Sequence, residues 1–162
     1  MSDVILRGVT AADEDFLVGL YATTRPEVAM FGWDEAEQHA FIRMQFDMQR
    51  RSYAMQSPTA EHSVIAYEGR NAGRLIVERS ATSLSLTDIA ILPEFRQKGI
   101  ATLIIKRLQD EAERTGRSIE LTVERMNVNA FQLYRKLGFE VTGENQLHLA
   151  MKWTPKDKQG RK

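Results

Sequence analysis

The sequence predicts an α/β domain built on a mixed, mostly antiparallel and twisted sheet of about six or seven strands, flanked by about four helices. Runs with strand and helix periodicity follow one another in the order β-α-α-β-β-β-α-β-α-β-β. Neighbouring strand runs joined by short turns favour hairpins, whereas strand runs separated by a helix favour crossovers. The length of 162 residues suits one domain. We place it at residues 1–154 and expect a polar, disordered tail over 155–162.

The first half of the chain contains one strand, two helices and a hairpin. Each helix begins at a capping-box pattern, in which an acidic residue follows a Thr or Asp by three positions. In the second helix, the apolar stripe of Phe41, Met44 and Met48 is expected to face the core. The expected elements are a strand over 4–9, a helix from Thr10 to about Arg25, a loop over Arg25–Trp33, a helix from Asp34 to about Met55, and strands over 61–68 and 73–80 around a turn at Gly69–Ala72.

The second half alternates strands with two more helices. Its first helix carries a core-facing stripe that includes Ile104 and Leu108, and Gly116 ends it. The last helix has apolar residues at helical spacing, and Gly138 closes it. The expected elements are a strand over 84–92, a helix over 102–115, a strand over 118–123, a helix ending at Leu137, and strands over 139–143 and 146–153.

Composition and charge exclude several classes of function. The chain has no cysteine, which excludes disulfides, thiol catalysis and thiolate metal sites. Lys plus Arg and Asp plus Glu both number 22, so no overall attraction to nucleic acid or membrane is expected. The N-terminus lacks the apolar core of a signal peptide, no apolar run is long enough to span a membrane, and the three histidines lack metal-ligand spacing. We therefore expect a cytoplasmic protein with no metal, nucleic-acid or membrane partner.

The turn from Arg96 to Ala101 connects a strand-like run to a helix-like run. The first N–H groups of a helix have no partner within the helix, and the helix dipole adds partial positive charge there. Gly99 and Ala101 keep this surface free of large side chains. The turn therefore predicts a site where the main chain binds a diphosphate.

Two segments resemble the GNAT superfamily of N-acetyltransferases. Residues 87–101, TDIAILPEFRQKGIA, contain the family's acetyl-CoA-binding signature, Arg/Gln-x-x-Gly-x-Gly/Ala. Residues 127–139, NVNAFQLYRKLGF, resemble its Asn-x-x-Ala-x-x-Leu-Tyr-x-x-x-Gly-Phe segment. The resemblance covers about Leu84 to Phe139. It implies a GNAT-type fold and transfer of an acetyl group from the co-substrate acetyl-CoA to an amine acceptor, by direct attack in a ternary complex.

The resemblance also implies which residues bind the cofactor. N–H groups between Gln97 and Thr102 would bind the pyrophosphate, and the main chain of Ile89–Ile91, separated from its neighbouring strand, would pair with the pantetheine amides. A main-chain group near Ile91 would stabilise the oxyanion. The implied cofactor-binding residues are Ile89, Ala90, Ile91, Arg96, Gln97, Lys98, Gly99, Ile100, Ala101, Thr102 and Asn127.

Tyr134 matches the family's general acid, which protonates the departing CoA thiolate. By spacing alone it would be a core aromatic residue. The general base does not carry over directly, because some members have a glutamate five residues before the motif asparagine, where this chain has Thr122. Glu124 is our first candidate for the base and Asp88 our second, and either could equally be a surface charge. Asn127 could also be the N-cap of the last helix.

The acceptor site has no recognisable motif. In the family, the first helix pair and its connection form one wall of this site, so Arg25, Phe31 and Trp33 are candidates, with Glu27 and Asp34 beside them. Phe31 and Trp33 could instead pack the loop against the sheet. The acceptor could be a small molecule or a peptide or protein amine. The alternatives are a non-catalytic acyl-CoA sensor and a transferase of another acyl group, and exposed C-terminal strands would allow a homodimer.

Overall fold

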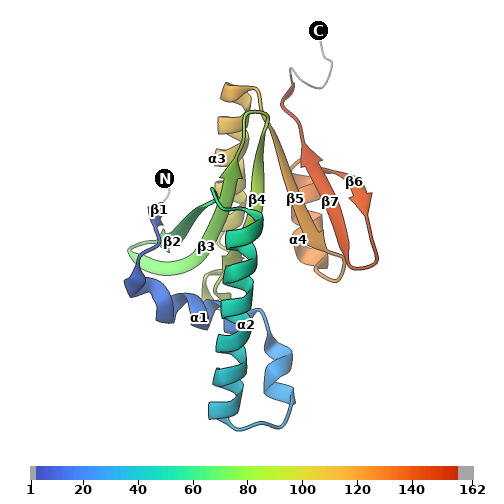
Figure 1. The fold of residues 1–162 in the computed structure, drawn as a ribbon. Coiled ribbons are helices and arrows are strands. Elements are labelled where there is room, and N and C mark those ends of the chain that lie inside the picture. The colour runs from blue at the N-terminus through green and yellow to red at the C-terminus, as the bar shows by residue number, and fades with distance from the viewer. Residues whose placement is uncertain (1–2, 157–162) are drawn as a thin grey trace. The chain divides into compact units, whose positions relative to one another are not determined.

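The computed structural model describes residues 3–156. Within this range, seven strands form one sheet in the order β1-β2-β3-β4-β5-β7-β6, accompanied by four α-helices (Figure 1). The mixed α/β class and the mostly antiparallel sheet are confirmed. The strands are β1 (Val4–Gly8), β2 (Glu61–Tyr67), β3 (Arg70–Arg79), β4 (Ser83–Ile91), β5 (Ser118–Glu124), β6 (Glu140–Glu144) and β7 (His148–Trp153). The helices are α1 (Glu14–Thr23), α2 (Glu35–Gln56), α3 (Ile100–Thr115) and α4 (Val128–Lys136).

Contacts divide the chain into two compact units. The first comprises residues 1–75 and 90–96, and the second comprises residues 76–89 and 97–162. The domain boundary at residue 154 stays a prediction. Of the expected tail, Pro155 is buried, and residues 157–162 lie outside the described residues. None of the described helices is long and apolar enough to cross a membrane.

The hairpin of the first unit turns earlier than the sequence suggested. Glu68 and Gly69 both have left-handed backbone angles, with φ values of 51° and 81°. Two consecutive positive φ angles define the two-residue turn that matches the twist of antiparallel strands. The expected turn over Gly69–Ala72 was therefore wrong, because β3 already begins at Arg70.

Helices α1 and α2 pack together in the first unit. Both capping boxes are confirmed: Asp13 Oδ2 accepts from Thr10 N at 2.8 Å, and Asp34 Oδ1 accepts from Glu37 N at 2.8 Å. A short 3₁₀ helix over Pro26–Met30 replaces part of the expected loop. The core of this unit is formed by Leu17, Val18, Tyr21, Val28, Ile42 and Phe46.

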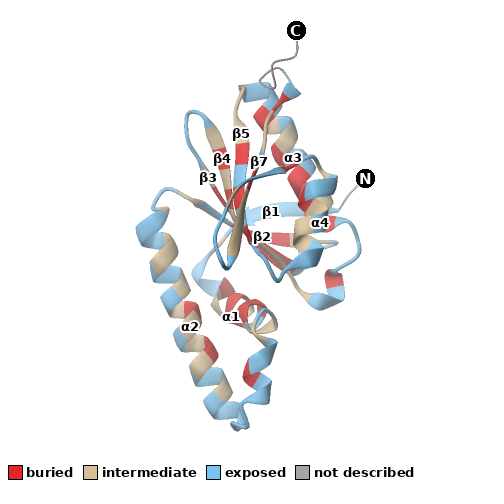
Figure 2. Cartoon of the chain, turned by 90° about the vertical axis from the view of Figure 1, so that its right-hand side faces the viewer, coloured by how far each residue is buried: buried red, intermediate tan, exposed pale blue. Residues whose placement is uncertain are grey.

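The expected core stripe of α2 was wrong in two of its three residues. Met44 and Met48 are 49% and 57% exposed, and Phe41 is only partly buried. Ile42 and Phe46 are buried instead, and Phe46 packs its ring 6.0 Å from that of Tyr21 on α1. At 100° per residue, positions 42 and 46 share the face toward α1 and positions 44 and 48 lie away from it. Figure 2 accordingly shows most of α2 as exposed or intermediate.

The second unit is built on β5, β7 and β6, which lie side by side (Figure 1). Both pairs are antiparallel, with Leu121 opposite Met151 in the first. The amphipathic helix α3 begins at a left-handed Gly99 and ends at a left-handed Gly116. Its buried face is formed by Ile100, Ile104, Ile105, Leu108 and Ala112.

Candidate active site

The pairing between β4 and β5 ends halfway along both strands. It is parallel and includes only Ser83–Leu86 on β4 and Ser118–Leu121 on β5. Beyond this point β4 continues to Ile91, while β5 continues in register with β7 alone. Among the described residues, the register between β4 and β5 therefore ends at Leu86 and Leu121. An unpaired strand edge presents main-chain donors and acceptors to a ligand that contains amide groups.

A main-chain anion site lies at the start of α3. Gly99 is the N-cap with φ 78°, and the non-glycine Gln97 also has a positive φ of 62°. Leu103 N donates to Gly99 O at 3.0 Å, so the N–H groups before Leu103 have no acceptor within the helix. A Cβ atom added to Gly99 would meet no atom within 4 Å, so open space adjoins this turn. The turn can therefore hold an anionic group against the N–H groups and the helix dipole.

Residues 90–96 belong to the first unit, where their main chain is firmly held. Leu92 N donates to Ala72 O at 2.8 Å, and a Cβ atom on Gly73 would lie 2.2 Å from Ala90 O. Gly73 therefore allows a close approach that no other residue would permit. The Arg96 side chain donates from Nε to Ile91 O at 3.0 Å. Arg96 thus binds the main chain here, a contact that sequence patterns could not reveal.

Asn127 forms the N-cap of α4. Its Oδ1 accepts from Ala130 N at 3.2 Å, and its own N–H donates to Glu124 O at 2.9 Å. This confirms the interpretation of Asn127 as the N-cap of the last helix. The side-chain NH₂ group and the second lone pair of Oδ1 are left to bind a ligand.

Tyr134 lies on the buried face of α4 with 7% of its surface exposed. Its ring centroid is 5.7 Å from that of Phe139. Burial, and secondly the negative charge of Asp88, raise the pKa of the Tyr134 phenol to about 12. The phenol therefore stays protonated throughout the neutral range and can donate a proton. Of the residues expected to be catalytic, Asp88 is thus near enough to Tyr134 for its charge to act on the phenol.

The third candidate, Glu124, is exposed at the end of β5, where it lies opposite His148 of β7. Among residues 3–156, its carboxylate forms no hydrogen bond or ion pair that links it to Tyr134. Thr122 on the same strand is exposed as well. No group of three or more residues suited to a metal ion occurs in the described part of the chain.

The three acceptor candidates lie in the first unit, between α1 and α2. Arg25 pairs through Nε with Glu27 Oε2 at 2.6 Å and donates from Nη1 to the Tyr21 hydroxyl at 3.0 Å. Phe31 and Trp33 pack edge to face, with ring centroids 4.9 Å apart, and Trp33 lies 5.2 Å from Phe41 of α2. They remain 45% and 37% exposed. Their packing against α2 leaves part of each ring available to a ligand.

Two features of the site carried little signal in the sequence. The end of the β4–β5 pairing at Leu86 follows from three-dimensional register, which no local pattern encodes. The left-handed conformation of Gln97 could not be predicted from the sequence either, because this conformation is typical of glycine, asparagine and aspartate.

The end of the β4–β5 register, the turn before α3 and the buried phenol are the candidate features of a site for an acyl-CoA. Residues 29–159 match the family model described as an acetyltransferase (GNAT) domain, so the chain belongs to the GNAT acetyltransferase family. It is an acetyltransferase that uses acetyl-CoA. No curated protein sequence matches the chain at a significant level.

Solved structures share the fold at low sequence identity. One is the PaiA N-acetyltransferase from Thermoplasma acidophilum in complex with coenzyme A (TM-score 0.70, 17% identity, covering 95% of this chain and 99% of that chain). Another is a SpeG spermidine N-acetyltransferase chimera from Vibrio cholerae and hSSAT (TM-score 0.65, 21% identity, 99% and 100% covered). A third is Naa50 from Arabidopsis thaliana in complex with the bisubstrate analogue CoA-Ac-MVNAL (TM-score 0.63, 16% identity, 94% and 99% covered).

The raised pKa of Tyr134 predicts one phenol that ionises late. In an ultraviolet titration of the four tyrosines, a step near pH 12 should disappear in Tyr134→Phe and persist in Tyr67→Phe. Asp88→Asn should move this step to lower pH, because it removes a negative charge that opposes the phenolate. In the unfolded chain the Tyr134 phenol ionises at about pH 10, below its pKa in the folded protein. The free energy of unfolding should therefore fall as the pH rises from about 10 toward 12. Four coincident steps in the native protein would contradict the assigned environment.

Proposed function

We propose that the chain acetylates an amine by direct attack on acetyl-CoA within a ternary complex. The end of the β4–β5 register at Leu86 is the observation that supports this most strongly. Pantetheine is a chain of amides, and the edge of β4 beyond Leu86 would bind it as an added strand, while the N–H groups between Gln97 and Thr102 would bind the pyrophosphate. Residues 1–154 would act as a single catalytic domain.

The thioester would then lie with its carbonyl oxygen toward a main-chain N–H near Ile91. The amine nitrogen attacks the carbonyl carbon, and the resulting oxyanion is stabilised by that donor. The carbon–sulfur bond breaks, the sulfur leaves with the electron pair, and Tyr134 gives it a proton. A buried phenol with a pKa of about 12 remains protonated until this step. With no cysteine in the chain, the acetyl group is not passed through a thiol of the enzyme.

The attacking amine must lose a proton, and we propose that Asp88 accepts it, directly or through water. This reverses the order of the two candidates, because the charge of Asp88 acts on Tyr134 whereas Glu124 lies exposed at the strand end. Asp88 gains one proton from the amine and Tyr134 loses one proton to the sulfur, so the number of protons on the enzyme is unchanged. Proton exchange with solvent, or between Asp88 and Tyr134, then restores the original protonation state of both groups.

We propose an acceptor with a primary amine that contacts Arg25, Phe31 and Trp33. The partly exposed aromatic pair offers an apolar surface, and Arg25 is already held by Glu27 and Tyr21. Of the structures with a similar fold, one is named for spermidine and another contains CoA-Ac-MVNAL. The fold is therefore compatible with amines of small molecules and with amines of peptides.

Tyr134→Phe should lower kcat by about 10- to 1,000-fold while leaving the affinity for acetyl-CoA nearly unchanged. The reason is that the substitution removes one hydroxyl from the sulfur and keeps the packing of the ring. Thiol release from acetyl-CoA with a panel of amines measures kcat, and calorimetry measures binding. An unchanged kcat would remove Tyr134 from the mechanism. Tight binding with no turnover on any amine would favour an acyl-CoA sensor, and faster turnover with succinyl-CoA would favour another acyl group.

Asp88→Asn should reduce kcat/KM by about 100-fold or more, whereas Glu124→Gln should change it by less than about threefold. Both substitutions remove one carboxylate and keep the size of the side chain, so the second is a matched control. The same thiol-release assay checks both at several pH values. The opposite ranking would restore Glu124 as the base.

A further inference from the structure

The side of α2 that faces away from α1 is largely apolar and exposed. At about 3.6 residues per turn, positions 37, 40, 44, 48, 51 and 55 all lie within about 40° of one direction around the helix axis. The residues at these positions are exposed, and we call them the methionine face: Glu37, Ala40, Met44, Met48, Arg51 and Met55. The exposed fractions of its three methionines are 49%, 57% and 83%. A helix face in water is normally polar, so this face is suited to contact with another molecule.

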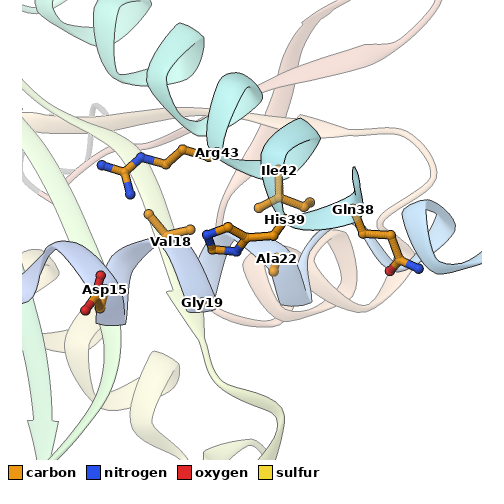
Figure 3. Close-up of a pocket in the computed structure, with 8 residues that line it drawn as sticks. All are labelled: Asp15, Val18, Gly19, Ala22, Gln38, His39, Ile42 and Arg43. Carbon is orange, nitrogen blue, oxygen red and sulfur yellow. The ribbon is translucent and has the colours of Figure 1, made fainter. Parts of the chain in front are cut away.

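The opposite side of α2 is already packed. Ile42 and Phe46 are buried there in the core that α2 shares with α1. Figure 3 shows Ile42 on the side of α2 that faces Val18 and Ala22 of α1, where these residues line a cavity between the two helices. Positions 42 and 46 lie about 160° from Met44 around the helix axis. Packing within the first unit therefore leaves the methionine face exposed.

The two charged residues of the methionine face have no ion-pair partner in the described part of the chain. Arg51 forms no hydrogen bond or ion pair with any other residue in the range 3–156. Glu37 Oε1 accepts from Asp34 N at 3.0 Å, but no basic side chain among these residues pairs with the carboxylate. By contrast, the two arginines on the neighbouring side of α2 pair with carboxylates of the first unit. One positive and one negative charge are therefore available to a partner.

The methionine face is complementary to itself about Met44. Ala40 and Met48 each lie four positions from Met44, and Glu37 and Arg51 each lie seven positions from it. If two antiparallel helices related by a two-fold axis meet at Met44, each residue lies opposite its counterpart at equal distance. Glu37 then faces Arg51 of the partner subunit, and Ala40 faces Met48 of the partner subunit. Opposite charges meet twice, and a small side chain lies against a large one.

The same arrangement extends to Trp33 and Met55, which each lie eleven positions from Met44. Trp33 would thus meet Met55 of the partner subunit, and contacts between a thioether and an aromatic ring are favourable. Trp33 is then shared between the partner subunit and the acceptor site, a consequence that rests on the proposed function. Centring the contact on Met48 instead would place Glu37 opposite a residue beyond the end of the partner's helix, because α2 ends at Gln56.

We propose that two copies of this chain associate through their methionine faces, with the two α2 helices antiparallel and Met44 on the two-fold axis. Burial of the methionines supplies most of the attraction, and the two ion pairs fix the register. Only one helix of each copy contributes, so the interface is small, and we expect a dissociation constant of about 10 to 100 μM. The association requires neither acetyl-CoA nor turnover.

The C-terminal strands, which also suggested a homodimer, are the less suitable surface. Strand β6 lies at the edge of the sheet, where a second copy could pair with it. It carries Glu140 and Glu144 within five residues, and its register is broken between Val141 and Gly143. Charged side chains and bulges at a sheet edge oppose pairing with another strand. The structure therefore favours α2 over β6 as the contact between copies.

Sedimentation velocity of the full chain from about 1 μM to about 1 mM tests the proposal. The chain should shift from monomer to dimer across this range. Met44→Glu places two like charges on the axis and should weaken the dimer at least about tenfold. Met126→Glu changes another exposed methionine, between β5 and α4, and should leave the dimer unchanged. A chain that stays monomeric throughout, a dimer that survives Met44→Glu, or equal loss in both variants would overturn the proposal.

A charge exchange tests the register. Arg51→Glu and Glu37→Arg should each weaken the dimer at least about tenfold, because each creates two like-charged pairs, and an equimolar mixture of the two variants should restore it. Circular dichroism confirms that α2 is retained in Glu37→Arg, which keeps the bond from residue 37 N to Asp34 Oδ1. A mixture of folded variants that stays monomeric would overturn the proposal. Should Glu37→Arg fail to fold, the comparison of Met44→Glu with Met126→Glu decides alone.

Discussion

The early end of the β4–β5 pairing is the constraint on which the proposed chemistry depends. Parallel hydrogen bonding stops at Leu86 and Leu121, and β5 remains in the sheet through its antiparallel pairing with β7. Main-chain groups left unpaired at a strand edge cost free energy unless water or a ligand satisfies them. An amide-bearing ligand satisfies them with the same geometry as a strand. The fold therefore keeps one strand position open, and β7 supplies the pairing that makes this possible.

In the proposed mechanism, Tyr134 would serve both packing and proton transfer. Its ring packs beside Phe139 within the core of the second unit, which fixes the direction of the hydroxyl group. The same burial raises its pKa, and the nearby charge of Asp88 adds to the effect. Both causes keep the phenol neutral, as a proton donor must be before its proton is required. A core residue and a general acid are therefore compatible interpretations of one side chain.

The sequence predicted the parts of this protein that local physics determines. Capping residues such as Asp34 and Asn127 and the glycines beside α3 have local signatures, and the structure has these features where they were expected. Apolar residues occur on more than one side of α2, so the sequence does not show which side is buried. Packing against α1 buries the side with Ile42 and Phe46. The end of strand pairing, by contrast, arises between segments that are far apart in the sequence. The contact of Arg96 with Ile91 O is local, but it depends on the path of the chain between them, for which the sequence has no pattern.

Amide hydrogen exchange with and without coenzyme A tests the central claim most directly, since it reports on individual main-chain N–H groups. If the open edge of β4 and the start of α3 bind the cofactor, exchange should slow at least about tenfold for β4 amides between Thr87 and Ile91 and for amides from Gln97 to Thr102. The Glu68–Gly69 turn should be unaffected. Unchanged exchange in both segments at saturating coenzyme A, or protection confined to other parts of the chain, would contradict the account.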